Sequence, residues 1–166
     1  MSLCTGPAAI RWPKTDAPHI SWEEVGSGLS AKQLRRGHDV CLIGAGKMLE
    51  TVCEAADMLS ALGISSTIWD PRLIRPIDTE MLQDAAKHPF VVTVEDGFTE
   101  GGFGTATQTA LSELAPNTQV KVLGIPIGHH AHGKPEEILA SFSLDARGIT
   151  EQVNRLFHSK NENKHQ

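Results

Sequence analysis

One glycine-rich segment, residues 95–104, brings acidic and aromatic side chains together between a predicted strand and a predicted helix. The paired carboxylates of Glu95 and Asp96 suggest acid-base chemistry, but no catalytic partner lies near them in the sequence. Two phenylalanines in the segment lack an obvious core partner, and exposed aromatic side chains often anchor protein contacts. We therefore interpret the segment as a docking loop, with an unspecialised connector as the alternative. The docking residues that we predict are Glu95, Phe98, Gly101, Gly102 and Phe103.

A second candidate site is the histidine cluster formed by His129, His130 and His132. Its HHxH spacing does not match a known zinc pattern, and no cysteine or acid nearby completes a ligand set. We therefore assign no metal ligand and no catalytic residue to this chain, and the role of the three histidines stays open.

A GxG turn at residues 44–46, with Asp70 near the end of the next predicted strand, has features of a nucleotide-binding fingerprint. However, Leu49 stands where a third glycine would allow close helix packing, so a simple packing turn is the preferred interpretation. A free-standing nucleotide-binding module remains the alternative from another functional class. Arg72 and Arg75 follow the second strand, and we interpret them as a solvated loop or as salt-bridge partners of a neighbouring domain.

Apolar runs that are typical of buried strands alternate with amphipathic helical patterns from residue 40 onward. The first run covers residues 40–43, and the helix after it is predicted to stop at Gly63. Helix and strand then alternate, which predicts a parallel α/β sheet flanked by helices. The remaining predicted strands are 66–69, 90–94 and 120–123, and the remaining helices are 79–87, capped by Asp78, 103–114, one from Pro135 and one after Asp145.

The composition excludes several functional classes. With 166 residues and 40% hydrophobic content, the chain is long enough for one domain with an ordinary core. Its net charge of -5 comes from interspersed acids and bases, which gives no signal for nucleic-acid binding. Three cysteines without CxxC spacing fit a cytoplasmic protein, and no apolar stretch is long enough to predict membrane insertion.

Several segments, in order and spacing, resemble the 1-deoxy-D-xylulose-5-phosphate synthases. Residues 6–14, GPAAIRWPK, resemble the GPxAxRYPRG segment that ends the pyrimidine-binding domain of that family, with Lys14 in place of its second arginine. Further similar segments are DPRLIRPID at 70–78 (family DxRFxKPLD), VTVEDG at 92–97 (VTVEE), GGFG at 101–104 (GGFGS) and LDARGI at 144–149 (LDAxGI). The resemblance covers about residues 6–157.

The resemblance implies a transketolase C-terminal-domain-like fold. This fold has a mostly parallel five-stranded sheet with one antiparallel strand, flanked by helices. It also implies that residues 1–39 are the end of the pyrimidine-binding domain and a linker, and that 40–158 are the C-terminal domain. The polar composition after Phe157 predicts a disordered tail at 159–166.

Full-length members of that family resemble transketolase. They use thiamine diphosphate and a divalent metal to condense pyruvate with glyceraldehyde 3-phosphate, with loss of CO2, for isoprenoid, thiamine and pyridoxal synthesis. This chain contains no GDG motif for the metal and diphosphate, and the catalytic glutamate is expected upstream.

The resemblance therefore implies an assembly domain that binds no cofactor and is inactive alone. It is expected to pack against the catalytic domains of a homodimer, with Lys14 and Arg11 contacting a substrate phosphate. The same-fold alternative is the C-terminal domain of transketolase itself or of a 2-oxo-acid dehydrogenase beta subunit.

Overall fold

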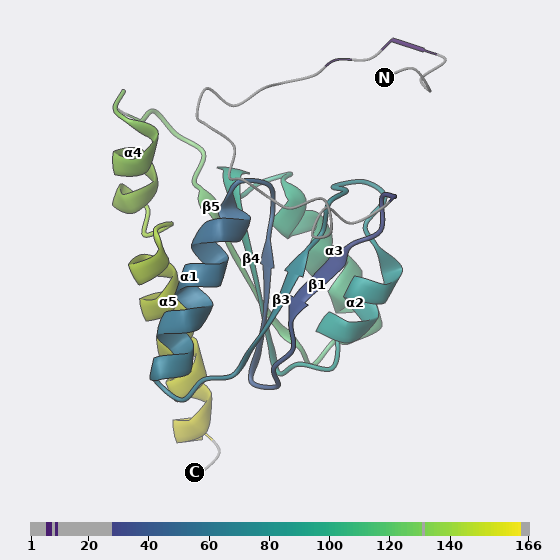
Figure 1. Ribbon diagram of the computed structural model, residues 1–166, viewed down its shortest axis with the longest axis vertical. Coiled ribbons are helices and arrows are strands. Elements are labelled where there is room, and N and C mark those ends of the chain that lie inside the picture. Colours follow the sequence, from purple (N-terminus) through teal and green to yellow (C-terminus); the bar gives the residue numbers. More distant parts are fainter. Residues whose placement is uncertain (1–5, 8, 10–27, 131, 164–166) are drawn as a thin grey trace.

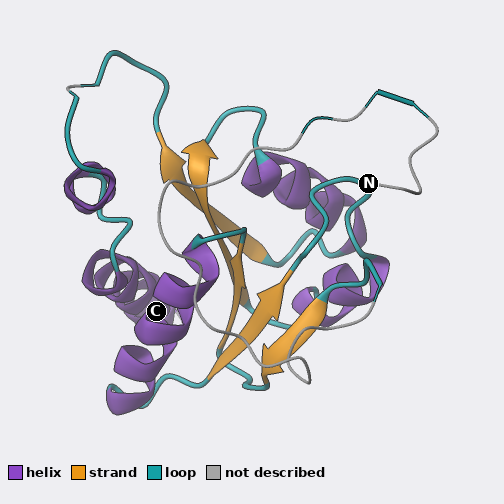
Figure 2. Ribbon diagram, turned by 45° about the horizontal axis from the view of Figure 1, so that its top comes forward, coloured by secondary structure: helices purple, strands orange, loops and turns teal. Residues whose placement is uncertain are grey.

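The computed structural model describes residues 6, 7, 9, 28–130 and 132–163, which form a five-stranded sheet between two layers of helices (Figures 1 and 2). Arg11 and Lys14 lie outside the described residues. The strands are β1 (Lys32–Arg35), β2 (Val40–Gly44), β3 (Ser66–Asp70), β4 (Phe90–Phe98) and β5 (Gln119–Ile125). The helices are α1 (Met48–Ala61), α2 (Thr79–Ala85), α3 (Phe103–Leu114), α4 (Pro135–Ser141) and α5 (Ala146–Asn163).

The sheet has the strand order β1-β3-β2-β4-β5, and only β1 runs antiparallel to its neighbour. This confirms the predicted fold class of a mostly parallel sheet with one antiparallel strand. The position of β1 is a difference, because it lies inside the 1–39 segment that we assigned to a preceding domain and linker. Its four residues, KQLR, carry no apolar alternation, so the strand depends on pairing with β3 rather than on a pattern of its own.

Two aspartates tie β1 and the residue before it to the rest of the domain. Asp78 accepts a hydrogen bond from the backbone N–H of Ala31 at 3.1 Å, and Asp84 accepts one from the side-chain amide of Gln33 at 2.8 Å. The indole N–H of Trp69 donates to the same Asp84 oxygen at 3.0 Å. These bonds connect α2, β3 and the start of the sheet, and they add to the short β1 ladder.

Each face of the sheet has its own apolar core, because successive strand residues point to opposite faces. Leu42 and Val92 pack with α1 and α5 on one face, while Cys41 and Val91 pack with α2 and α3 on the other. All five residues of β2 are buried, as the continuous apolar run predicted for a strand covered on both sides. In Figure 2 the two helical layers flank the central sheet.

Several predicted element ends are confirmed and others are extended. The carboxylate of Asp78 accepts from the backbone N–H of Met81 at 3.0 Å, so it is the N-cap of α2 as predicted. Gly63 follows α1 with a positive φ of 80°, a conformation that favours glycine. By contrast, β4 runs to Phe98 instead of 94, and α5 continues to Asn163, past the boundary expected at residue 158.

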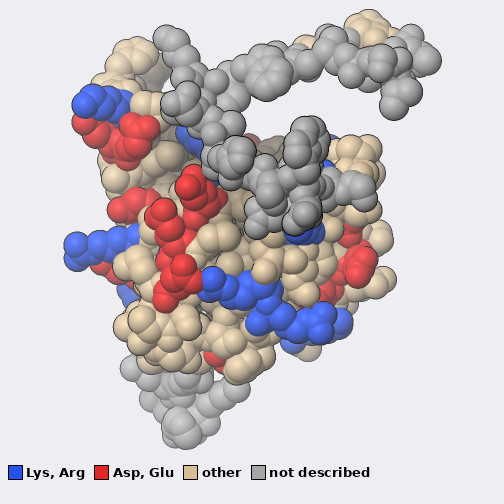
Figure 3. Space-filling view, viewed as in Figure 1, with Lys and Arg blue, Asp and Glu red and all other residues tan. Residues whose placement is uncertain are grey.

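Charges on the face shown in Figure 3 are mixed, with acidic and basic side chains side by side. One ion pair of opposite charges joins Arg35 of β1 to Asp57 of α1, with side-chain atoms 2.5 Å apart. Within the described part of the chain, none of the helices is long and apolar enough to cross a membrane.

Candidate functional site

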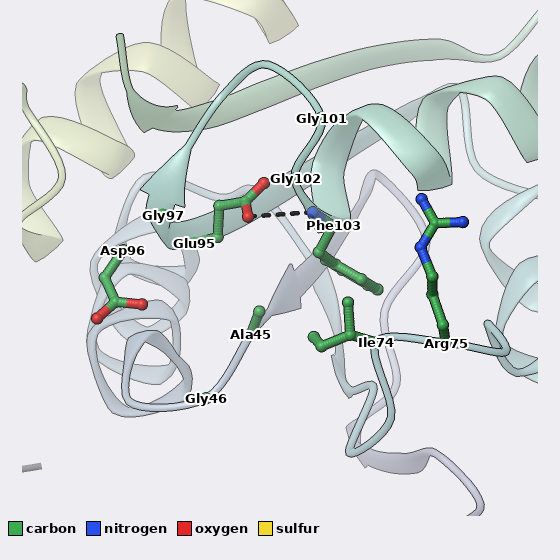
Figure 4. A pocket seen from close by; sticks show the side chains of 10 residues that line it. All are labelled: Ala45, Gly46, Ile74, Arg75, Glu95, Asp96, Gly97, Gly101, Gly102 and Phe103. Carbon is green, nitrogen blue, oxygen red and sulfur yellow. Dashed lines mark hydrogen bonds between the residues drawn. The ribbon is translucent and has the colours of Figure 1, made fainter. Parts of the chain in front are cut away.

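A pocket of about 320 Å³ opens at the carboxyl ends of β2 and β4 (Figure 4). The helix that follows β2 packs on one face of the sheet, and the helix that follows β4 packs on the other. The chain therefore leaves these neighbouring strands in opposite directions, and open α/β sheets bind ligands at such switch points. The pocket is lined by the turn after β2, the end of β4, the start of α3, and two residues after β3, namely Ala45, Gly46, Ile74, Arg75, Glu95, Asp96, Gly97, Gly101, Gly102 and Phe103.

The carboxylate of Glu95 caps α3 from outside the helix. Its two oxygens accept hydrogen bonds from the backbone N–H groups of Phe103 at 3.1 Å and Gly104 at 2.8 Å. Gly102 is the N-cap residue and offers no side chain to these N–H groups. Since the amino end of a helix carries partial positive charge, a carboxylate with only 7% exposure is stabilised there.

Glycines surround the side chain of Glu95 because larger residues would collide with it. A Cβ atom on Gly102 would overlap the Glu95 carboxylate and come within 2.5 Å of the Phe98 carbonyl oxygen. A Cβ atom on Gly104 would lie 2.5 Å from the Thr93 hydroxyl and 3.2 Å from a Glu95 oxygen. The glycine-rich segment therefore packs closely around the buried carboxylate of Glu95. This close packing argues against the alternative of an unspecialised connector.

The two phenylalanines of the predicted docking loop have different environments. Phe103 is only 2% exposed and packs in the domain's own core with Ile43 and Leu111, so the expectation that it lacks a core partner is wrong. It opens α3 on the helix face that also carries Leu111, eight residues later, and this face covers the sheet. Phe98, by contrast, is 53% exposed where β4 pairs with Ile125 of β5. Gly101 is also exposed, with a φ of 73°.

The turn after β2 behaves as the packing turn that the sequence favoured. A Cβ atom on Gly44 would lie 2.8 Å from the Cα atom of Leu49, which shows how closely the helix approaches the strand. Asp70, the candidate ribose-binding acid, instead accepts a hydrogen bond from the backbone N–H of Arg72 at 2.9 Å. The buried carboxylate of Glu95 lines the same pocket at the start of α3, so a phosphate bound there would meet a negative charge. These contacts disfavour a nucleotide site.

Some pocket residues could not be grouped from the sequence. Asp96 lies 3.4 Å from the ammonium group of Lys47, and each of the two side chains is 45% exposed. Lys47 follows β2 and Asp96 lies in β4, so the pair depends on the adjacency of these two strands. The exposed Ile74 was also missed, although an apolar residue four positions past a strand and next to Arg75 was a usable signal.

The histidine cluster forms no metal site with the described residues. His129, His130 and His132 are exposed, and one His130 ring nitrogen lies 2.7 Å from the carbonyl oxygen of Pro126. The His130 ring also packs edge-on against Phe142, with centroids 4.8 Å apart. Across residues 28–130 and 132–163, no three histidine, cysteine or acidic side chains converge as metal ligands would.

The fold and the buried Glu95 carboxylate define a mixed α/β domain with a charged pocket at a switch point of its sheet. The sequence profile described as "Transketolase, C-terminal domain" matches residues 29–149. The chain therefore belongs to the transketolase C-terminal domain family.

Curated relatives are similar along almost the whole chain. A 1-deoxy-D-xylulose-5-phosphate synthase of Trichormus variabilis is 37% identical over 94% of this chain, and one of Magnetococcus marinus is 32% identical over 90%. The chain spans only 25% of the length of each relative. It thus aligns with one portion of these longer relatives.

Solved structures show the same fold. A chain titled "Split gene transketolase, inactive beta4 tetramer" superposes with a TM-score of 0.77 at 29% identity, covering 85% of this chain and 46% of that chain. Transketolase of Campylobacter jejuni superposes with a TM-score of 0.54 at 17% identity, covering 76% of this chain and 18% of that one. Because its sequence identity is so low, the similarity to the Campylobacter jejuni enzyme supports the fold alone.

Thiamine diphosphate, the cofactor implied by the family, does not fit the residues of this pocket. A diphosphate needs several free N–H groups or cations, whereas the N–H groups at the start of α3 already bind the Glu95 carboxylate. Arg75 is the one cation among the described residues that line the pocket. A second carboxylate, Asp96, lines the same pocket. We therefore derive no catalytic step through this cofactor from the present chain.

Proposed function

We propose that this chain is the C-terminal assembly domain of a 1-deoxy-D-xylulose-5-phosphate synthase. The parent enzyme condenses pyruvate with glyceraldehyde 3-phosphate in the cytoplasm, with loss of CO2, and its product feeds isoprenoid, thiamine and pyridoxal synthesis. Thiamine diphosphate and Mg²⁺ bind to other domains of the parent enzyme. The observation that carries the proposal is the match of 94% of this chain to 25% of a synthase. The transketolase alternative is weaker, because the split-gene transketolase chain is 29% identical and the Pichia stipitis and Campylobacter jejuni enzymes only 15–17%, against 37% for the Trichormus variabilis synthase.

In this proposal the domain docks through the end of β4 and the loop that follows it. Phe98 supplies an exposed aromatic side chain, and Glu95 holds the loop against α3 through its two hydrogen bonds. Gly102 permits this close approach, while the exposed Gly101 lies at the loop surface. Phe103 supports the loop from the core instead of contacting a partner directly.

The proposed partners are the catalytic domains of the same enzyme and a second subunit. The similar split-gene transketolase chain is described as an inactive β4 tetramer. This description supports a domain that takes part in assembly while lacking activity by itself. Lys14 and Arg11, which lie outside the described residues, are proposed to contact the phosphate of glyceraldehyde 3-phosphate, as the resemblance implies.

Reconstitution tests this function. The part of the parent enzyme upstream of this chain and the chain itself are purified separately, then assayed alone and mixed, with pyruvate, glyceraldehyde 3-phosphate, thiamine diphosphate and Mg²⁺. We expect neither part alone to form product efficiently and the mixture to regain both activity and the dimer, followed by light scattering. Turnover by this chain alone, or a fully active upstream dimer without it, would refute the proposal.

A further inference from the structure

Two charged side chains of the pocket at the ends of β2 and β4 have unused hydrogen-bonding capacity. Each oxygen of Glu95 accepts one hydrogen bond from a described residue, and a carboxylate oxygen can accept about two. The guanidinium group of Arg75 forms no hydrogen bond or ion pair with any residue that the structure describes. The other charged residue that lines the pocket, Asp96, already pairs with Lys47 at 3.4 Å.

The buried carboxylate determines which charge its end of the pocket can accept. Glu95 is 7% exposed and lines the pocket, so an anion placed beside it would be repelled with little screening by water. A cation with N–H donors would instead occupy the free lone pairs of Glu95, and hydrogen bonds to a charged group are among the stronger ones. The Glu95 end therefore selects an ammonium or a similar donor.

The Arg75 end has the opposite preference, and apolar surface lies between the two ends. Figure 4 shows the ring of Phe103 between Glu95 and Arg75, with the side chain of Ile74 turned toward that ring. An exposed guanidinium with five N–H donors suits a carboxylate, which it can bind with two parallel hydrogen bonds. Ile74 is 47% exposed and offers apolar contact beside this cation.

We propose that this pocket is a binding site for a small zwitterion, namely a free amino acid with an aliphatic side chain. Its ammonium group binds Glu95, its carboxylate binds Arg75, and its side chain packs on Ile74. The volume of about 320 Å³ is at the lower end of the range for small-molecule sites, in keeping with a ligand of this size. This site goes beyond the assembly role, because it gives the domain a ligand of its own.

Three matched probes test the site in the 166-residue chain by NMR of its backbone amides. L-valine carries both charges, isobutylamine lacks the carboxylate, and isovalerate lacks the ammonium. We expect saturable shifts of the amides of Gly97, Gly102 and Phe103 with L-valine, and binding roughly tenfold or more weaker for the other two probes. Lack of saturation with L-valine overturns the proposal. Equal binding of isovalerate or of inorganic phosphate also overturns it, because the site would then be a simple anion site at Arg75.

Substitutions separate the two ends of the pocket. Arg75→Gln removes an exposed cation without touching the core and should weaken L-valine binding roughly tenfold while leaving isobutylamine binding unchanged or tighter. Lys121→Gln, an exposed substitution of equal charge change on β5, is the matched control and should leave L-valine binding unchanged. If Arg75→Gln binds L-valine like the parent chain, or if Lys121→Gln weakens it equally, the proposed orientation is wrong.

Discussion

The substitution Glu95→Gln tests whether the buried carboxylate holds the start of α3. Glutamine has the same shape, but it carries no charge and has one oxygen acceptor instead of two. Its amide NH₂ group would therefore face one of the two N–H groups, of Phe103 or Gly104, that Glu95 now satisfies. The helix would lose a charge-assisted hydrogen bond, and two buried donors would face each other.

The expected loss follows from these two effects. A hydrogen bond to a charged group contributes roughly 1.5–3 kcal/mol, and an unsatisfied buried donor costs roughly 1–3 kcal/mol. We expect the free energy of unfolding to fall by about 3 kcal/mol, because partial relaxation of the glutamine side chain offsets the upper end of these values. For a domain of this size, that loss lowers Tm by about 10 °C.

Urea unfolding of the isolated chain, followed by circular dichroism, measures this loss. Amide hydrogen exchange adds a local readout, because the N–H groups of Phe103 and Gly104 should lose protection more than those in the middle of α3. Asp96→Asn is the matched control, since its carboxylate is 45% exposed and its one ion pair among the described residues is with Lys47. This control should change the free energy of unfolding by about 0.5 kcal/mol or less.

An unfolding free energy for Glu95→Gln within about 0.5 kcal/mol of the parent chain would refute the capping role. Equal losses for Glu95→Gln and Asp96→Asn would also refute it. In that case the effect would come from the general charge of the loop, and not from the two hydrogen bonds at the helix start.

Three further predictions concern the parent enzyme and the acid stability of the domain. Phe98→Ala in the parent enzyme should weaken assembly by about 2 kcal/mol if this side chain is an anchor, and unchanged dimer dissociation in analytical ultracentrifugation would count against docking. Lys14→Ala should lower kcat/KM for glyceraldehyde 3-phosphate by roughly tenfold to a hundredfold, while Lys14→Arg preserves it; equal kinetics of both variants and the parent would remove the phosphate role. Hydrogen bonds from the N–H groups of Met81 and Ala31 hold the pKa of Asp78 below its ordinary value of 3.8, so its stabilising effect is present above pH 3.8 and is lost as the pH falls further. Asp78→Asn should therefore show a shallower loss of stability in acid unfolding, and an identical acid limb would contradict this linkage.

The sequence predicted the strands and helices well where burial imposes a period. The run at residues 40–43 and the spacing of apolar residues in α1 correspond to elements packed on a core, and Asp78 and Gly63 were readable as a cap and a stop. The pattern did not predict β1, because its sequence carries no period and its strand state depends on pairing with β3. It also ended β4 at residue 94, since Glu95, Asp96 and Gly97 are poor strand formers whose extended shape depends on pairing with β5.

The sequence was enough to single out the segments that contribute to the candidate site, but it did not predict which of their side chains meet. The order of short motifs was enough to indicate the family, because motif spacing is a property of the chain itself. The environments of Glu95 and Phe103 depended on tertiary structure, since burial follows from what α3 packs against. Arg75 follows β3 and Glu95 lies in β4, twenty residues later. They line one pocket because the strand order places β2 between these two strands, so that their carboxyl ends lie at one edge of the sheet. Sequence alone therefore determined the elements and the family, while the crossover connections decided which side chains meet and which charges remain unpaired.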